Sequence, residues 1–170
     1  MIDSSIKCLN RLDKQLCLTH LPNLFQTFMQ SLSVSHHKNV HLAITNCLCT
    51  TLEKCVEPNI QLLIEDLNRS AENKKSILYK LFTHIESGLS YQFHSVWIFV
   101  MKIIACAFTS FKHPQTFIIV DKCIRSLANL RESEQFDYKK EADLAIGRAV
   151  QNYGPKLVID CIPLGITGEE

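Results

Sequence analysis

Glycine and proline are scarce in this chain. Five residues of each occur among 170, which is about half of their usual share in globular proteins. The many tight turns of a β-sandwich or a β-barrel depend on these residues. Hydrophobic residues make up 46% of the sequence, and a chain of this length buries enough apolar surface for a single core. The composition therefore predicts an all-α fold in one folded unit.

An excess of charge of one sign is also missing. Eighteen lysines and arginines stand against 17 aspartates and glutamates, which leaves a formal net charge of +1. No block of like charge is longer than the pairs Lys74-Lys75 and Lys139-Lys140. The chain therefore lacks the dominant positive field of a typical nucleic-acid-binding domain, although a local basic stripe on one face is compatible with this balance.

Neither a secretion signal nor a membrane span is predicted. The first five residues are polar or mixed, and no apolar signal core follows them. The longest apolar stretch, from Val96 to Phe111, contains Lys102 and is shorter than the roughly 20 residues that a span requires. We interpret it as a deeply buried helix of a protein that has no membrane partner.

Sequence motifs for catalysis are absent. The five glycines cannot be arranged into GxGxxG or GxxxxGK[ST], and neither GxSxG nor HExxH occurs. The remaining candidate is a cysteine–histidine nucleophile pair, in which Cys106 or Cys161 would be activated by His94 or His113. No local pattern supports such a pair. We expect no enzymatic activity, no cofactor and no small-molecule substrate.

The cysteines favour a reducing, intracellular compartment. No CxxC pair occurs, and several cysteines fall within apolar helical stretches, where a free thiol behaves as a small hydrophobic residue. A metal site near His36, His37 and His41 would require Cys47 and Cys49 to act together. These two thiols diverge by about 200° on one helix, so we predict no metal there. The eight cysteines are Cys8, Cys17, Cys47, Cys49, Cys55, Cys106, Cys123 and Cys161.

Apolar residues recur at intervals of three and four along almost the whole chain, which is the pattern of amphipathic helices. Prolines and polar bends divide this pattern into about nine helices, with Pro22 expected to end one helix and begin the next. The predicted segments are approximately 4–20, 22–32, 38–55, 57–67, 71–89, 93–111, 114–129, 138–153 and 156–162.

Prolines also suggest a repeat of helix pairs. Pro22 and Pro58, and again Pro114 and Pro155, are separated by intervals within the range of about 35–45 residues typical of HEAT and armadillo repeats. Each of these prolines is expected to open the second helix of a pair. The longer gap between Pro58 and Pro114 breaks the period. We favour an α-solenoid of antiparallel pairs over the alternative, a closed helical bundle, because each pair carries an apolar stripe too wide for its partner alone.

Two kinds of surface compete as interpretations of the basic residues. Lys122 and Arg125 lie on the outer face of a helix predicted to be the second of its pair, the position that lines the binding face of HEAT solenoids. Contact with a partner or with RNA phosphates is one interpretation. Ordinary solvated faces are the other, because acidic residues are interspersed. The remaining candidates for contact are Lys74, Lys75, Lys139 and Lys140.

The C-terminal part of the chain resembles a known family. Residues 145–158 read AIGRAVQNYGPKLV and are followed by CIPL at 161–164, while residues 91–97 read YQFHSVW. These segments resemble the corresponding motifs of the ribosomal RNA processing protein 12 family, whose members are long HEAT-repeat proteins of small-subunit ribosome assembly. The similarity is strongest over residues 87–164. Because the chain is much shorter than the family's members, we expect a fragment or a truncated product.

The resemblance implies structural roles for five residues. Gly147 would permit a close helix approach, Gly154 and Pro155 would stop one helix and start another, and Pro163 with Leu164 would end a repeat. We expect one HEAT-like unit over residues 1–164 and a tail at 165–170.

The same resemblance implies a non-catalytic scaffold for the maturation and nuclear export of small-subunit pre-ribosomes. Such a scaffold would lie in the nucleus and nucleolus and would bind pre-ribosomal proteins, with pre-ribosomal RNA as a further ligand. The alternative is a scaffold that binds only proteins, such as a nuclear transport receptor or a phosphatase-type scaffold.

Overall fold

The computed structural model describes residues 14–70 and 73–162, and this part of the chain is all-α. It contains eight α-helices and no strand, so the all-α class is confirmed, whereas the predicted number of about nine helices is not matched there. The helices are α2 (Lys14–Val34), α3 (Lys38–Thr51), α4 (Ile60–Arg69), α5 (Ile77–Ser87), α6 (Trp97–Ser110), α7 (Phe117–Glu132), α8 (Lys139–Tyr153) and α9 (Pro155–Cys161).

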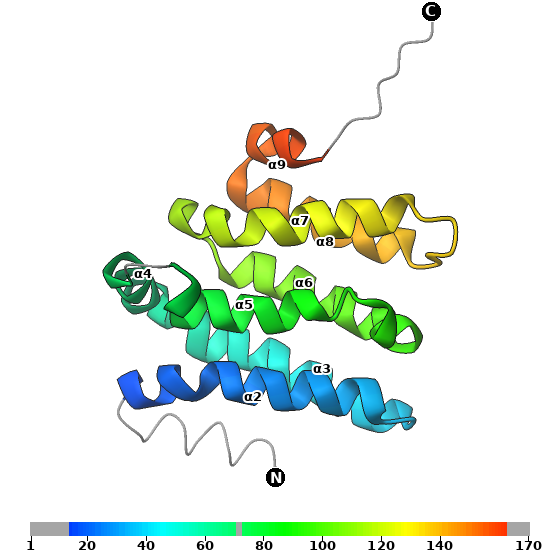
Figure 1. The fold of residues 1–170 in the computed structure, drawn as a ribbon, viewed down its shortest axis with the longest axis horizontal. Coiled ribbons are helices and arrows are strands. Elements are labelled where there is room, and N and C mark those ends of the chain that lie inside the picture. Colours follow the sequence, from blue (N-terminus) through cyan, green and yellow to red (C-terminus); the bar gives the residue numbers. More distant parts are fainter. Residues whose placement is uncertain (1–13, 71–72, 163–170) are drawn as a thin grey trace, which may run out of the picture.

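Three antiparallel helix pairs are stacked in the order of the sequence (Figure 1). The pairs are α2 with α3, α5 with α6, and α7 with α8. Helices α2, α5 and α7 form one layer, and α3, α6 and α8 form the other. The middle pair lies between the two outer pairs, so the described helices form an open stack rather than a closed bundle. This arrangement confirms that the helices form antiparallel pairs, but the members of the pairs differ from the prediction, which placed the helix after Pro114 second in its pair.

Pro22 lies inside a helix, so the predicted break at this residue is wrong. Helix α2 runs without interruption from Lys14 to Val34. A proline within a helix removes one backbone hydrogen bond and costs about 3 kcal/mol. The apolar stripe continues on both sides of Pro22, where Leu18, Phe25 and Met29 are buried. Burial of each such side chain contributes about 1.5–3 kcal/mol, which offsets the lost bond.

The other prolines mark chain breaks, but their places in the repeat differ from the prediction. Pro58 lies in a short 3₁₀ turn before α4, which is inserted between the first two pairs. Pro114 precedes α7, and α7 is the first helix of its pair rather than the second. Pro155 begins α9, which packs against both α7 and α8. Local chemistry located these breaks, whereas the pairing of helices depends on the stack.

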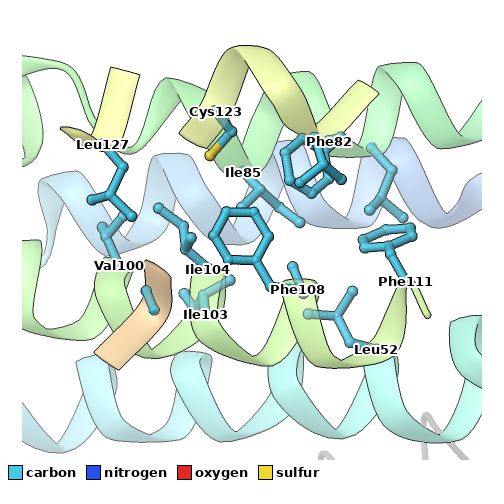
Figure 2. Packing of buried hydrophobic residues seen from close by; sticks show 14 of the residues in the cluster. Leu52, Phe82, Ile85, Val100, Ile103, Ile104, Phe108, Phe111, Cys123 and Leu127 are labelled. Carbon is cyan, nitrogen blue, oxygen red and sulfur yellow. The ribbon is translucent and has the colours of Figure 1, made fainter. Parts of the chain in front are cut away.

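Helix α6 is the centre of the core. The segment Tyr91–Ser110 is long and apolar enough to cross a membrane by composition, and most of it is buried within the stack. Figure 2 shows side chains of α6, among them Ile104 and Phe108, next to those of α5 and α7 in the facing layer. The ring centroids of Phe82 and Phe108 are 6.2 Å apart, and Phe111 meets Phe82 edge-on at 5.4 Å. The prediction of a deeply buried helix in this stretch is confirmed.

Gly88 ends α5 where three helices converge. A Cβ atom placed on Gly88 would lie 2.6 Å from Met29 Cε and 2.8 Å from Val100 Cγ1. Its backbone angles are those of an ordinary right-handed helix. Glycine is therefore required here for lack of space between α2, α5 and α6, and not for an unusual backbone conformation.

Candidate partner-binding surface

Lys122 connects two helices of the same layer. Its Nζ atom lies 3.1 Å from Glu86 Oε2 on α5, and the neighbouring Ser126 hydroxyl donates to Glu86 Oε1 over 3.2 Å. The side chain of Glu86 is only 15% exposed, whereas that of Lys122 is 72% exposed. Both oxygens of the largely buried Glu86 carboxylate thus have a hydrogen-bond partner on α7, and the charge of the exposed Lys122 ammonium is already partly neutralised.

Arg125 joins α7 to α9. Its Nε donates to Asp121 over 2.8 Å, and its Nη1 donates to the carbonyl oxygen of Cys161 over 3.3 Å. The Cys161 thiol donates to the same Asp121 carboxylate over 3.0 Å. Burial, followed by this carboxylate, raises the pKa of Cys161 to about 11. Arg125 and Asp121 therefore hold the last described helix in place, a role that the sequence did not reveal.

The structure does not bring the six predicted basic residues together. Lys122 and Arg125 lie on the first helix of the third pair, so the prediction that they lie on a second helix is wrong. Lys74 and Lys75 precede α5, whereas Lys139 and Lys140 begin α8. In Figure 1 these two helix starts lie on opposite sides of the stack, α5 beginning at the left and α8 at the right. Contact of any of these side chains with a partner stays a prediction.

The glycines of the family motif have different roles. A Cβ atom on Gly147 would meet no described atom within 4 Å, so the predicted close helix approach at this residue is wrong. Gly154 has φ +89° and ψ 151°, a conformation that is essentially restricted to glycine. Pro155 follows as the first residue of α9, and this stop and restart agrees with the prediction. Pro163 and Leu164 lie outside the described residues.

Polar side chains next to Gly154 lock the turn between α6 and α7. The Tyr153 hydroxyl donates to the Phe111 carbonyl oxygen over 2.6 Å and lies 3.0 Å from the Thr116 hydroxyl. Asn152 donates to the Phe108 carbonyl oxygen over 2.6 Å. Burial raises the pKa of Tyr153 to about 12. We missed these bonds in the sequence, where the only signal was two polar residues at a helix end before Gly-Pro.

The candidate cysteine–histidine pairs do not form among the described residues. The Cys106 sulfur lies 3.6 Å from the carbonyl oxygen of Cys49 on α3 and 3.8 Å from Oε1 of Glu53, in the short π-helix that follows α3. His94 instead contacts the Tyr91 carbonyl oxygen, and His113 accepts a bond from the backbone N–H of Gln115. The histidines of the candidate pairs thus serve local turns.

Cys49 points toward α6, away from the histidines near the start of α3. Its thiol is hydrogen-bonded to Cys106, which lowers the pKa of Cys49. His41 is buried, with Nε2 2.8 Å from the Ser35 carbonyl oxygen. Among the described residues no cluster of three potential ligands could hold a metal ion, and the seven described cysteines are free thiols. Cys8 lies outside that part of the chain.

An aromatic cluster joins the second and third pairs at their turns. It runs from His94 through Tyr91, Trp97 and Phe136 to Tyr138. The Tyr91 and His94 rings stack with centroids 4.8 Å apart, and Trp97 meets Phe136 at 5.2 Å. From the sequence, residues 91–97 were recognisable as part of a family resemblance and, from Phe93 on, as the start of a buried helix, but not as an aromatic cluster, because Phe136 and Tyr138 come from another turn.

A pocket of about 410 Å³ opens beside this cluster. We call it the Tyr91 pocket. Its volume lies in the range of small ligand-binding pockets. Its lining combines aromatic rings with polar side chains and includes Tyr91, His94, Trp97, Ser133, Asp137 and Tyr138.

Comparisons with known proteins identify the family. The family model described as "Ribosomal RNA-processing protein 12, HEAT repeats" matches residues 34–170. An RRP12-like protein of Gallus gallus is 37% identical over 162 residues, which cover 95% of this chain, and one of Homo sapiens is 36% identical over 160 residues, which cover 94%. The chain spans only 12% of the length of each relative. Together with the stacked helix pairs, these matches show that the chain belongs to the HEAT-repeat family of ribosomal RNA-processing protein 12.

Proposed function

We propose that this chain is a scaffold segment in ribosomal RNA processing, acting in the maturation and nuclear export of small-subunit pre-ribosomes. It would act in the nucleus and nucleolus by holding pre-ribosomal proteins on the surface of its helix stack. The family match over most of the chain is the observation that carries this proposal. The stacked pairs support it, because solenoids offer extended surfaces for partners.

Proteins, rather than RNA, are the partners that the charge distribution favours. A continuous track for a phosphate backbone needs several unpaired cations along one surface. Lys122 and Arg125 are engaged with Glu86 and Asp121. Lys74 and Lys75 precede α5 and Lys139 and Lys140 begin α8, and these two helix starts lie on opposite sides of the stack. Any RNA contact by these residues would therefore be confined to separate sites and would not follow a continuous phosphate backbone.

Affinity purification from nuclear extract tests the proposal. The tagged full chain is expected to retain small-subunit pre-ribosomal proteins, and to retain them after nuclease treatment. The double variant Lys139→Ala/Lys140→Ala is expected to purify with the same proteins. Failure of the intact chain to enrich pre-ribosomal proteins would refute the scaffold role. Loss of these proteins after nuclease treatment would instead assign the tethering to RNA.

A further inference from the structure

We propose that the Tyr91 pocket binds an arginine side chain from a basic segment of a protein partner. The pocket lies between the turn that precedes α6 and the turn that joins α7 to α8. Both turns lie on the same side of the stack, at the right in Figure 1. A side chain inserted there would contact both the second helix pair (α5 and α6) and the third (α7 and α8).

The pocket has an exposed aromatic ring, that of Tyr91. Tyr91 is 72% exposed, although its ring is held against His94 at an interplanar angle of 11°. Trp97 meets the same Tyr91 ring edge-on at 6.4 Å. A guanidinium group stacks favourably on the face of such rings by cation–π attraction. A ring that is stacked on one neighbour and open to solvent can receive such a group.

The charge of the pocket lining also favours a cationic side chain. The described lining contains the Asp137 carboxylate and no lysine or arginine. No hydrogen bond or ion pair joins Asp137 to another residue within the described chain. The nearby Glu134 is also exposed, while Lys139 and Lys140 stay outside the lining. A carboxylate beside aromatic rings favours a planar cation that can form two parallel hydrogen bonds, and it disfavours a phosphate.

Intrinsic fluorescence provides a direct test with the purified 170-residue chain. Trp97 is the only tryptophan, so its emission reports events in the Tyr91 pocket. A peptide of repeated Gly-Arg-Ser units is expected to change this emission in a saturable manner, and a Gly-Gln-Ser peptide is expected to have no effect. Tyr91→Ala and Asp137→Asn should each weaken binding roughly 2- to 30-fold, which corresponds to the range of a cation–π contact or a single ion pair.

Matched variants separate the pocket from general effects. Tyr91→Phe keeps the ring and should bind like the unmodified chain. Glu134→Gln removes a neighbouring charge outside the lining and should also leave affinity unchanged. Far-UV circular dichroism verifies the fold of each variant. The proposal is overturned if the arginine peptide fails to bind, or if Tyr91→Ala and Asp137→Asn bind it normally. It is equally overturned if a single-stranded RNA oligonucleotide, and not the peptide, occupies the pocket.

The identification of the partner as a protein rests on the scaffold function proposed above. Binding of arginine by the Tyr91 pocket is tested separately, with purified components. A chain that binds the peptide but retains no pre-ribosomal proteins would refute the scaffold role alone. A chain that retains these proteins but does not bind the peptide would refute the pocket alone.

Discussion

Replacing Gly88 or Gly147 by alanine is expected to change stability in opposite directions. The chemical change is the same, since each variant adds one methyl group. Gly88 has the backbone angles of a right-handed helix, and Gly147 lies within helix α8. At Gly147 the new Cβ meets no described atom within 4 Å. Gly147→Ala should therefore raise the free energy of unfolding by about 0.4–1 kcal/mol, because the unfolded chain loses conformational freedom.

At Gly88 the same methyl group has no space. Its contact with Met29 Cε can be relieved, since that atom ends a flexible side chain. Val100 Cγ1 lies 2.8 Å away on a side chain that is fully buried in α6, so the helices must separate slightly. Overpacking of this kind costs about 1–3 kcal/mol. After subtraction of the chain-entropy gain of about 0.4–1 kcal/mol, Gly88→Ala should lower the free energy of unfolding by about 1.3 kcal/mol at the midpoints of the two ranges and by at most about 2.6 kcal/mol.

Urea denaturation followed by far-UV circular dichroism measures both effects. A change of about 1 kcal/mol also moves the melting temperature by about 2–4 °C in a chain of this size. Val100→Ala provides a control, because it removes the clashing methyl group. In the double variant Gly88→Ala/Val100→Ala, the loss should be smaller than the sum of the single losses. Additive losses, or equal shifts for Gly88→Ala and Gly147→Ala, would refute the packing argument.

Three further predictions follow from the contacts described above. Gly154→Ala should lower the free energy of unfolding by about 1–3 kcal/mol, because alanine is strained at φ +89°; denaturation equal to that of the unmodified chain would contradict this. Burial raises the pKa of Tyr153 to about 12, above the usual value of about 10 for an unfolded chain. The unfolded state therefore loses this proton first, and stability should fall as the pH rises from about 10 through about 12. Tyr153→Phe should lose about 0.5–1.5 kcal/mol at neutral pH through its bond to Phe111 and show a shallower alkaline decline; parallel pH profiles would exclude this role. Lys122→Ala should cost no more than about 1 kcal/mol, because its bond to Glu86 is largely exposed on the lysine side, and high salt should reduce that difference; a larger loss that salt does not change would be inconsistent with a surface ion pair.

Most helix boundaries in the second half of the chain could be predicted from local chemistry. The sequence predicts a helix over 138–153, and α8 spans Lys139–Tyr153. Gly154 and Pro155 end one helix and begin the next because of their own backbone restrictions. At Pro22 the same local rule was wrong. Burial of the α2 stripe against α3 and α5 outweighs the cost of a proline within the helix.

The candidate surfaces could be predicted only in part. Spacing correctly placed Lys122 and Arg125 on the polar side of one helix. Their partners Glu86 and Cys161 lie on other helices, so periodicity within one segment carries no signal for these contacts. The Tyr91 pocket was missed for the same reason, because Tyr91 and Asp137 belong to turns that meet only when the second and third pairs stack.

The sequence by itself determined the all-α class, the succession of amphipathic helices and the family resemblance. These properties depend on hydrogen bonds and apolar spacing among residues that are close in the chain. Only the tertiary structure decided that α7 is the first helix of its pair, that Gly88 rather than Gly147 lies at a close approach, and that the basic residues are dispersed. The physical reason is that contacts between repeats depend on how whole helices pack, and such packing is shared among residues that are distant in sequence.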